Sequence, residues 1–331
     1  MSRFIDRYDA AMFDLDGVVY LGPDSVEGAP AALAELRKLA VKVGFVTNNA
    51  GRSADVVVDH LNTLGIECQL SDVVTSAQAI AQVMRRELPE GAKVQVCGAQ
   101  ALKDEMITAG FTVVNDFSEG PVAVVQGYDP YLSWPSLDNA GFAIQHGARW
   151  FCSNTDFTRP THLGLVPGAG AQIAALRAAV PDAPITVAGK PYPPLLQETI
   201  QRMKADAPVF VGDRLDTDIE GAHNVGIDSF MVFTGAHGKQ DLVTAIPEQR
   251  PTAIGWNIDG LLEPRREASW QADAVICGGA RAEARDGIVL IDGPLNSVAE
   301  QLDALWAIAQ LTWNDESLDA AEALETLSLI P

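Results

Sequence analysis

The sequence lacks a disulfide framework, a membrane-spanning run and a signal-peptide pattern. Its few cysteines have no metal-ligand spacing, which predicts free buried thiols in a reducing compartment. They are Cys68, Cys97, Cys152 and Cys277. No apolar run reaches the roughly 20 residues that a transmembrane helix needs, and no signal-peptide pattern precedes Asp14. We therefore expect a cytoplasmic protein without a membrane partner.

Positive charge is also scarce. The 331 residues include 44 Asp and Glu against 23 Lys and Arg, which gives a formal net charge of −21. Such a surface repels nucleic acid and anionic lipid, so neither is expected as a partner. An anionic substrate would require a metal ion and local cations to reverse the field inside its site. The chain is 47% hydrophobic, enough for a sizeable core, and its length predicts about two domains.

The most informative stretch is residues 10–19, where an apolar run without helical period ends in two carboxylates and a glycine. It predicts a buried strand that carries Asp14 and Asp16 out of its carboxyl end. Alternate side chains of a strand share a face, so both carboxylates could approach one ligand, and Gly17 permits a sharp turn. Taken alone, the stretch also fits an ordinary turn. A calcium loop is not expected, because no glutamate closes a twelve-residue loop.

Strands and helices alternate along the first part of the chain. After the first strand, a helix is expected over residues 28–40, a strand over 41–47, a helix over 53–64 and a short strand over 73–75. The order β-α-β-α-β predicts a doubly wound parallel sheet.

A second α/β pattern begins near residue 76, and the first resumes after the hinge-like segment 181–184. We therefore interpret the middle unit as an insertion. The predicted fold is α/β: a doubly wound, Rossmann-like parallel-sheet core with an inserted α/β cap domain and a small C-terminal β-β-α extension. The predicted boundaries are 1–78 and 186–264 for the core, 79–185 for the cap and 265–331 for the extension.

The extension is expected to contain two strands, at residues 274–279 and 287–292, joined by a polar link. Ser297 and Glu300 form a capping-box pattern at the start of an apolar helix. About 65 residues are few for an independent domain. The extension should therefore pack on the main body or across a homodimer.

Polar side chains follow three of the core strands at their carboxyl ends, and a lysine lies at the start of a predicted helix. These candidates are Asp14 and Asp16, Thr47 and Asn48, Asp213 and Asp218, and Lys190. In an open parallel sheet the carboxyl ends of the strands share one crevice, so we expect these groups to converge.

The set favours phosphoryl transfer. Asp14 is a carboxylate nucleophile able to form an aspartyl-phosphate, and Asp16 would protonate the leaving alkoxide and then activate water. Mg²⁺ would bind Asp14, Asp213 and the backbone carbonyl of Asp16.

The remaining members would act on charge and orientation. The Thr47 hydroxyl, the Asn48 N–H and Lys190 would neutralise the phosphoryl oxygens. Asp218 would orient Lys190 or a metal-bound water. For Asp216 we favour the simpler role of an acid at a helix start, and Arg214 can pair with a neighbouring acid.

Four motifs together resemble those of haloacid dehalogenase superfamily phosphatases. They are Phe13-Asp14-Leu15-Asp16-Gly17-Val18, Val46-Thr47-Asn48-Asn49, Gly189-Lys190-Pro191 and Gly212-Asp213-Arg214-Leu215-Asp216-Thr217-Asp218-Ile219. The Thr-Asn-Asn form is similar to the 4-nitrophenylphosphatase-like branch, which carries a large α/β (type C2) cap between the second and third motifs. The resemblance covers about residues 8–262 and implies Mg²⁺-dependent hydrolysis of phosphomonoesters.

The extension resembles the acetyltransferase-like C-terminal piece of actinobacterial family members, some of which are glycerol 3-phosphate phosphatases. It contains no complete acetyl-coenzyme A site, so a second activity is not expected. A small phosphorylated metabolite is the implied substrate, with glycerol 3-phosphate as first choice. Phosphoglycolate, pyridoxal phosphate and sugar phosphates are the alternatives, and a phosphomutase or a non-catalytic binding module are the rival functions.

Substrate specificity is expected in a polar loop of the cap, residues 152–162, which the resemblance places next to the substrate. A cap that covers the site excludes water and favours small phosphates over polymers. The candidate contacts are Asn154, Asp156, Arg159 and His162. The alternatives are that Asp156 braces the loop and that Arg159 or His162 is solvated.

Overall fold

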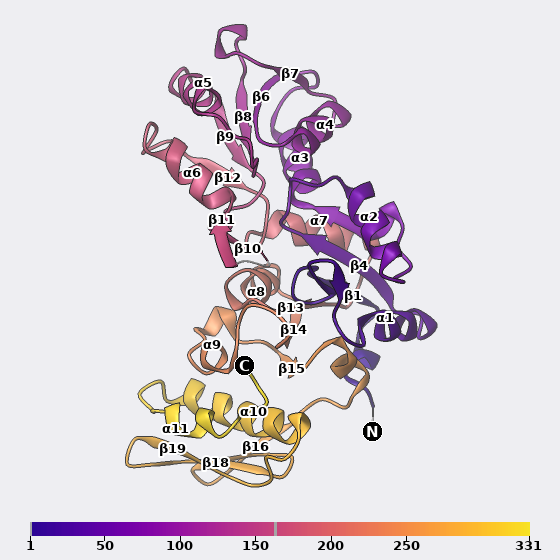
Figure 1. Ribbon diagram of the computed structural model, residues 1–331, viewed down its shortest axis with the longest axis vertical. Coiled ribbons are helices and arrows are strands. Elements are labelled where there is room, and N and C mark those ends of the chain that lie inside the picture. The colour runs from indigo at the N-terminus through magenta and orange to yellow at the C-terminus, as the bar shows by residue number, and fades with distance from the viewer. Residues whose placement is uncertain (1, 162–163) are drawn as a thin grey trace. The chain divides into compact units, whose positions relative to one another are not determined.

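The computed structural model describes residues 2–161 and 164–331. His162 therefore lies outside the described residues. The chain divides into two compact units (Figure 1): unit 1 comprises Met1–Val43 and Ala205–Pro331, and unit 2 comprises Gly44–Lys204. In the described part of the chain, no helix combines the length and the apolar character needed to cross a membrane.

The core of unit 1 contains parallel strands in the order β15-β14-β13-β1. Both β1 and β13 are buried along their whole length, as expected for strands that read as continuous apolar runs. The strands of this part are β1 (Ala10–Phe13), β2 (Tyr20–Leu21), β3 (Asp24–Ser25), β13 (Pro208–Gly212), β14 (Asp228–Val232) and β15 (Ala253–Gly255). The helices are η1 (Phe4–Arg7), α1 (Ala29–Lys38), η4 (Leu215–Ile219), α8 (Glu220–Val225), α9 (Lys239–Val243), η5 (Pro247–Gln249) and η6 (Ile258–Leu262).

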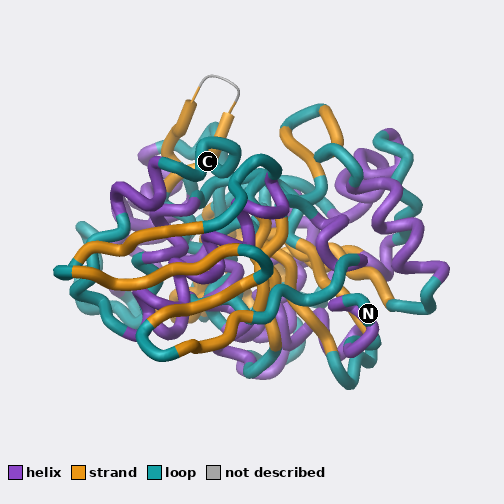
Figure 2. Tube along the Cα trace, turned by 90° about the horizontal axis from the view of Figure 1, so that it is seen from below, coloured by secondary structure: helices purple, strands orange, loops and turns teal. Residues whose placement is uncertain are grey.

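The C-terminal extension contains four antiparallel strands followed by two helices (Figure 2). They are β16 (Ala268–Gln271), β17 (Ala274–Cys277), β18 (Ala280–Arg285), β19 (Ile288–Asp292), α10 (Val298–Asn314) and α11 (Ala321–Glu325). The expectation of two strands is wrong, because the predicted polar link is strand β18. Its small Ala280 and Ala282 are buried, and the charged residues alternate with them. Alanine is a weak strand signal, so tertiary packing rather than propensity decides this segment.

Helix α10 packs on the strands of the extension and also on the core of unit 1. Its Thr312 hydroxyl donates to the Val243 carbonyl at 3.1 Å, and Trp313 Nε1 donates to the Leu242 carbonyl at 2.9 Å. One cluster of buried apolar side chains joins both parts. Within this chain the extension therefore packs on the main body, which was one of the two predicted arrangements. The Ser297–Glu300 capping box is also confirmed.

Unit 2 contains a second sheet, with parallel strands in the order β12-β9-β8-β6-β7, and the parallel pair β4-β5. Its strands are β4 (Lys42–Thr47, beginning at the unit boundary), β5 (Val73–Thr75), β6 (Lys93–Cys97), β7 (Thr112–Val114), β8 (Ala123–Gln126), β9 (Arg149–Cys152), β10 (Thr158–Thr161), β11 (Gly164–Pro167) and β12 (Ile185–Val187). Its helices are α2 (Ala54–Thr63), η2 (Leu70–Asp72), α3 (Ser76–Glu87), α4 (Gln100–Thr108), η3 (Phe117–Glu119), α5 (Trp134–Gln145), α6 (Ala169–Arg177) and α7 (Pro193–Met203).

The second α/β pattern is confirmed, with one difference in the expected polar loop. The antiparallel strands β10 and β11 lie in this region (Figure 2), so part of the segment is a hairpin arm. The sequence signal was weak because Thr158, Arg159 and Pro160 do not alternate between apolar and polar residues.

All four cysteines are free and buried, as the sequence predicted. Burial raises the pKa of Cys97 and of Cys277 to about 12, because the thiolate is poorly solvated there. The thiolate is the reactive form, so we expect alkylation of these two thiols by iodoacetamide at pH 8 to be at least about 100-fold slower in the native protein than in urea. Mass spectrometry of labelled peptides measures this ratio, and equal rates in both states would contradict the burial described here.

Candidate active site

Three carboxylates converge in unit 1. Asp14, Asp213 and Asp218 each place a ligand atom within 4.8 Å of the others. Asp213 is 3% exposed and Asp218 is 1% exposed. Strand pairing explains why Asp14 and Asp213 meet. Strand β1 lies parallel to β13, and the Asp14 N–H donates to the Val211 carbonyl at 2.9 Å. The carboxyl ends of adjacent parallel strands therefore carry both groups to one place, as predicted.

Gly17 closes the turn after the first strand and must be glycine for two reasons. Its φ of +91° lies in the left-handed region. A Cβ atom at this position would lie 2.5 Å from Asp213 Oδ2. The turn thus brings backbone, without a side chain, against a buried carboxylate. Asp16, one residue earlier, is exposed.

Asp218 lies on η4, which is a π-helical turn. The Ile219 N–H donates to the Arg214 carbonyl at 3.1 Å, a bond across five residues. The wide turn lets Asp218 Oδ2 accept from the N–H groups of Asp213 and Arg214, each at 3.1 Å. Asp218 therefore fixes the backbone that carries Asp213.

Arg214 and Asp216 form an ion pair beside this turn, at 2.7 Å between Nη2 and Oδ2. Burial works against ionisation of Asp216, but the Arg214 guanidinium outweighs it and keeps the pKa of that carboxyl below its usual value. The pairing of Arg214 with a neighbouring acid is what the sequence suggested.

Carboxylate oxygens are the protein ligands that Mg²⁺ prefers, so the donor set of Asp14, Asp213 and Asp218 fits that ion. Close carboxylates also disfavour one another's ionised form, and a divalent cation relieves this repulsion. The sequence assigned Asp14, Asp213 and the backbone carbonyl of Asp16 to the metal and gave Asp218 a supporting role. In the structure the Asp218 side chain is close enough to belong to the carboxylate group.

A second set of predicted residues gathers in unit 2. The Lys190 N–H donates to Asn48 Oδ1 at 2.8 Å, and Asn48 Nδ2 donates to the Lys190 carbonyl at 3.1 Å. The Lys190 side chain is 2% exposed. Thr47, at the end of β4, accepts the Asn49 N–H on its Oγ1 at 3.0 Å. The Asn48 side chain thus ties the second motif to the third.

The cap-loop candidates also contact Asn48. Its Nδ2 donates to Asp156 Oδ1 at 3.0 Å, and Asn154 Nδ2 donates to the Asn48 carbonyl at 2.6 Å. Ser76, which the sequence did not single out, donates to the same carbonyl at 2.5 Å. Asn154 and Asp156 therefore brace the motif residue. Arg159 is exposed, and its guanidinium lies over the Tyr128 ring.

Gly189 is required by close packing. A Cβ atom there would lie 2.7 Å from the Ser153 carbonyl oxygen and 2.8 Å from Asn48 Oδ1. The glycine of the Gly-Lys-Pro motif thus admits the backbone pairing between Lys190 and Asn48.

The sequence did not predict two contacts, one to the Asp213 carboxylate and one to the turn that follows Asp14. The Ala236 N–H donates to Asp213 Oδ2 at 2.6 Å, and the Thr234 hydroxyl donates to the Gly17 carbonyl at 2.6 Å. Neither residue type is diagnostic, and the loop is more than 20 residues beyond Asp213. The only available signal was its position directly after a core strand.

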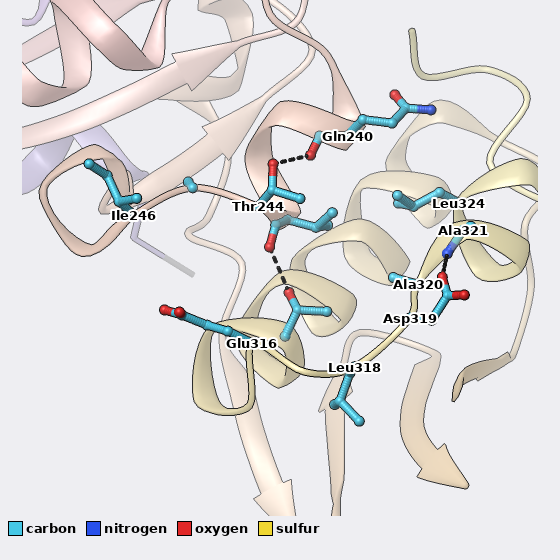
Figure 3. A pocket seen from close by; sticks show the side chains of 12 residues that line it. Gln240, Thr244, Ile246, Glu316, Leu318, Asp319, Ala320, Ala321 and Leu324 are labelled. Carbon is cyan, nitrogen blue, oxygen red and sulfur yellow. Dashed lines mark hydrogen bonds between the residues drawn. The ribbon is translucent and has the colours of Figure 1, made fainter. Parts of the chain in front are cut away.

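A pocket of about 460 Å³ lies in another part of unit 1, beside α9 (Figure 3). Its lining is mainly apolar, and its two carboxylates are already engaged: Glu316 pairs with Arg250, and Asp319 accepts the Ala321 N–H. It is lined by none of the candidate catalytic residues. A binding pocket needs a few convergent polar groups, so we assign the chemistry to the carboxylate group instead.

Comparison with known proteins identifies relatives of the whole chain. Residues 11–112 match a family described as haloacid dehalogenase-like hydrolase, and residues 187–261 match one described as HAD-hydrolase-like. The chain is 39% identical over 325 residues to D-glycerol 3-phosphate phosphatase of Mycobacterium tuberculosis, covering 96% of this chain and 90% of the relative. It is 32% identical over 238 residues to an acid sugar phosphatase of Staphylococcus saprophyticus, covering 71% and 90%.

Solved structures give the same grouping. A glycerol phosphate phosphatase from M. tuberculosis in complex with magnesium has a TM-score of 0.88 at 37% identity, covering 99% of this chain and 98% of that chain. The p-nitrophenyl phosphatase from Archaeoglobus fulgidus has a TM-score of 0.72 at 26% identity, covering 77% and 98%. The remainder of this chain has no counterpart in the second structure.

Two neighbouring asparagines allow a matched test of the unit 2 network. Asn48→Ala leaves the Lys190 N–H and carbonyl and the Asp156 carboxylate without their amide partner, so we expect a loss of about 3 kcal/mol in the free energy of unfolding. Asn49 is exposed and accepts one bond, from the Gly51 N–H. Asn49→Ala should cost below about 1 kcal/mol. Urea denaturation measures both, and equal losses would refute the bracing role of Asn48.

Proposed function

The chain belongs to the haloacid dehalogenase-like hydrolases, and from this premise we propose that it is a Mg²⁺-dependent phosphatase that hydrolyses glycerol 3-phosphate through an aspartyl-phosphate. The observation that carries the proposal is the convergence of Asp14, Asp213 and Asp218. Carboxylates held this close suit a divalent cation, and one of them directly follows the first core strand, where a nucleophile can meet a ligand.

Asp14, Asp213 and the backbone carbonyl of Asp16 would hold the Mg²⁺, with Asp218 beside them. When bound, the ion neutralises phosphate charge and orients the phosphoryl group. The chain has a net charge of −21, so an anionic substrate depends on such local compensation.

Asp14 attacks the phosphorus atom with one carboxylate oxygen, and the bond from phosphorus to the substrate oxygen breaks. Asp16 donates its proton to that leaving oxygen and becomes a carboxylate. It then takes a proton from water as the water oxygen attacks the phosphorus of the aspartyl-phosphate and the bond from phosphorus to the Asp14 oxygen breaks. Phosphate leaves, and both aspartates return to their starting states. The exposure of Asp16 supports this exchange of protons, because water can reach its carboxylate.

Thr47, Asn48 and Lys190 act on the phosphoryl oxygens. The Thr47 hydroxyl and the Asn48 N–H donate hydrogen bonds, and the Lys190 ammonium offsets the charge that develops in the transition state. Burial of Lys190 strengthens the attraction between its ammonium and the phosphoryl oxygens, because less water lies nearby to screen the charge. The Asn48 amide, held by Asp156 and Lys190, keeps the donors in position.

Glycerol 3-phosphate is the preferred substrate because the relative named for that activity matches this chain over nearly its full length. A sugar phosphate is the second candidate, since the acid sugar phosphatase relatives share 32% identity over a shorter part of the chain. Phosphoglycolate and pyridoxal phosphate remain comparison substrates.

The proposal includes a cytoplasmic location and no nucleic-acid partner, both supported by the acidic composition and the free thiols. It also retains the division into a hydrolase core, residues 1–78 and 186–264, with a cap at 79–185 and an extension at 265–331.

Removal of the nucleophile gives the first test. Asp14→Asn should lower the rate of phosphate release at least about 10³-fold, because an amide cannot form the acyl phosphate. Asp216→Asn changes a partly exposed aspartate of the motif that pairs with Arg214, and should keep activity within about threefold. Circular dichroism melting checks that both variants fold. Wild-type activity in Asp14→Asn would refute the nucleophile assignment.

A substrate panel gives the second test. The full chain, with Mg²⁺ present, is offered glycerol 3-phosphate, a hexose phosphate, phosphoglycolate and pyridoxal phosphate, and inorganic phosphate is measured. We expect the highest kcat/KM for glycerol 3-phosphate, by about tenfold or more. A higher value for the hexose phosphate would assign the enzyme to sugar phosphates. Isomerised ester without phosphate release would identify a mutase.

A further inference from the structure

The loop of residues 234–238, which follows β14, is built around Asp213. The Ala236 N–H donates to Asp213 Oδ2 at 2.6 Å, and the His237 N–H donates to the Asp213 carbonyl at 3.3 Å. A Cβ atom at Gly235 would lie 1.9 Å from Asp213 Oδ2. The direction of this carboxylate therefore depends on the path of the loop.

The same loop also contacts the turn that follows Asp14 and the first residue of η4, the turn that carries Asp218. The Thr234 hydroxyl donates to the Gly17 carbonyl at 2.6 Å. His237 Nδ1 accepts the Leu215 N–H at 2.9 Å, at the start of η4. A displacement of the loop would thus reach both neighbours of Asp213.

The C-terminal segment, residues 327–331, holds the chain directly after this loop. The Lys239 N–H donates to the Pro331 oxygen at 2.8 Å. Lys239 Nζ donates to the carbonyls of Leu327 and Ile330 at 2.6 and 2.7 Å. The Lys239 side chain is 9% exposed, and burial holds the pKa of its ammonium below the usual value. A buried ammonium needs such carbonyl acceptors, so the contact is specific.

The C-terminal segment is itself anchored in the extension. Leu327 and Ile330 are buried in the apolar cluster that contains α10. The Leu329 N–H donates to Oε1 of Gln301, a residue of α10, at 2.8 Å. On the side of α9 beyond Lys239, the chain borders the pocket (Figure 3), whose walls include Gln240, Thr244 and Leu324. Helix α10 also holds α9, through the carbonyls of Leu242 and Val243, but Lys239 is the contact that lies directly after the loop.

We propose that Lys239 is a positioning residue through which the C-terminal segment holds the loop of residues 234–238, and with it the Asp213 carboxylate, in the conformation that binds Mg²⁺. This inference rests on the proposed function. Under this proposal the extension supports the metal site, and it has this role without an active site of its own. Lys239 does not touch the substrate, and its effect passes through the backbone of the loop.

Lys239→Met tests this, because methionine keeps much of the apolar stem and removes the ammonium. Calorimetric titration of Mg²⁺ into the metal-free full chain should show affinity about 10- to 100-fold weaker than in the wild type. The matched control is Arg250→Met. Arg250 also links the core to the extension, through Glu316 and the Trp313 ring, but it does not contact the loop. Its Mg²⁺ affinity should stay within about twofold of the wild type.

A second variant covers the case in which Lys239→Met does not fold. Gln301→Met removes the acceptor of the Leu329 N–H and leaves Lys239 intact, and it should weaken Mg²⁺ binding a few-fold in the same direction. Unchanged Mg²⁺ affinity in the folded Lys239→Met variant overturns the inference while the phosphatase assignment stands. Equal weakening in Arg250→Met also overturns it, because general loosening would then explain the effect. A wild-type chain that hydrolyses no phosphomonoester refutes the proposed function instead.

Discussion

Electrostatic repulsion among Asp14, Asp213 and Asp218 is the constraint around which unit 1 is built. Carboxylates with ligand atoms within 4.8 Å destabilise one another unless cations or N–H dipoles offset their charge. The fold supplies backbone N–H groups to two of them: Asp218 accepts from Asp213 and Arg214, and Asp213 accepts from Ala236. Because these donors belong to the backbone, they stabilise the carboxylates without adding side chains in the space that a metal ion and a phosphate would occupy.

The parts of the fold and site that the sequence predicted are those where local pattern and tertiary structure agree. Strands β1 and β13 are continuous apolar runs, and each is followed directly by aspartate, so the meeting of Asp14 with Asp213 follows from parallel pairing. The Gly189-Lys190-Pro191 motif was identified from a lysine at a predicted helix start and from the family resemblance. Only the structure explains its glycine, by the approach of Ser153 and Asn48.

The remaining features depend on contacts between distant residues of unremarkable type. No sequence pattern in residues 234–239 predicts a contact with Asp213 or with the C-terminal segment. An alanine N–H and a lysine side chain are too common in proteins to indicate a particular partner. Strand β18 was missed because its buried residues are alanines, whose strand preference is weak and whose small size matters only once α10 lies against them. Asn154 and Asp156 were identified as polar, but their partner Asn48 could not be read from spacing.

The hydrogen bonds of Asn48 also bear on the order in which a newly synthesised chain completes the network around the second motif. Asp156 and Lys190, which fix its amide, are synthesised 108 and 142 residues after it. Contacts at such separation close late in folding, since the intervening loop must first be ordered. A nascent chain on the ribosome therefore carries the turn after β4, with the Ser76 contact within reach, long before the Asn48 amide meets Asp156 and Lys190. The proposed phosphate contacts of Thr47 and Asn48 would therefore gain the support of Asp156 and Lys190 only after both of those residues have emerged.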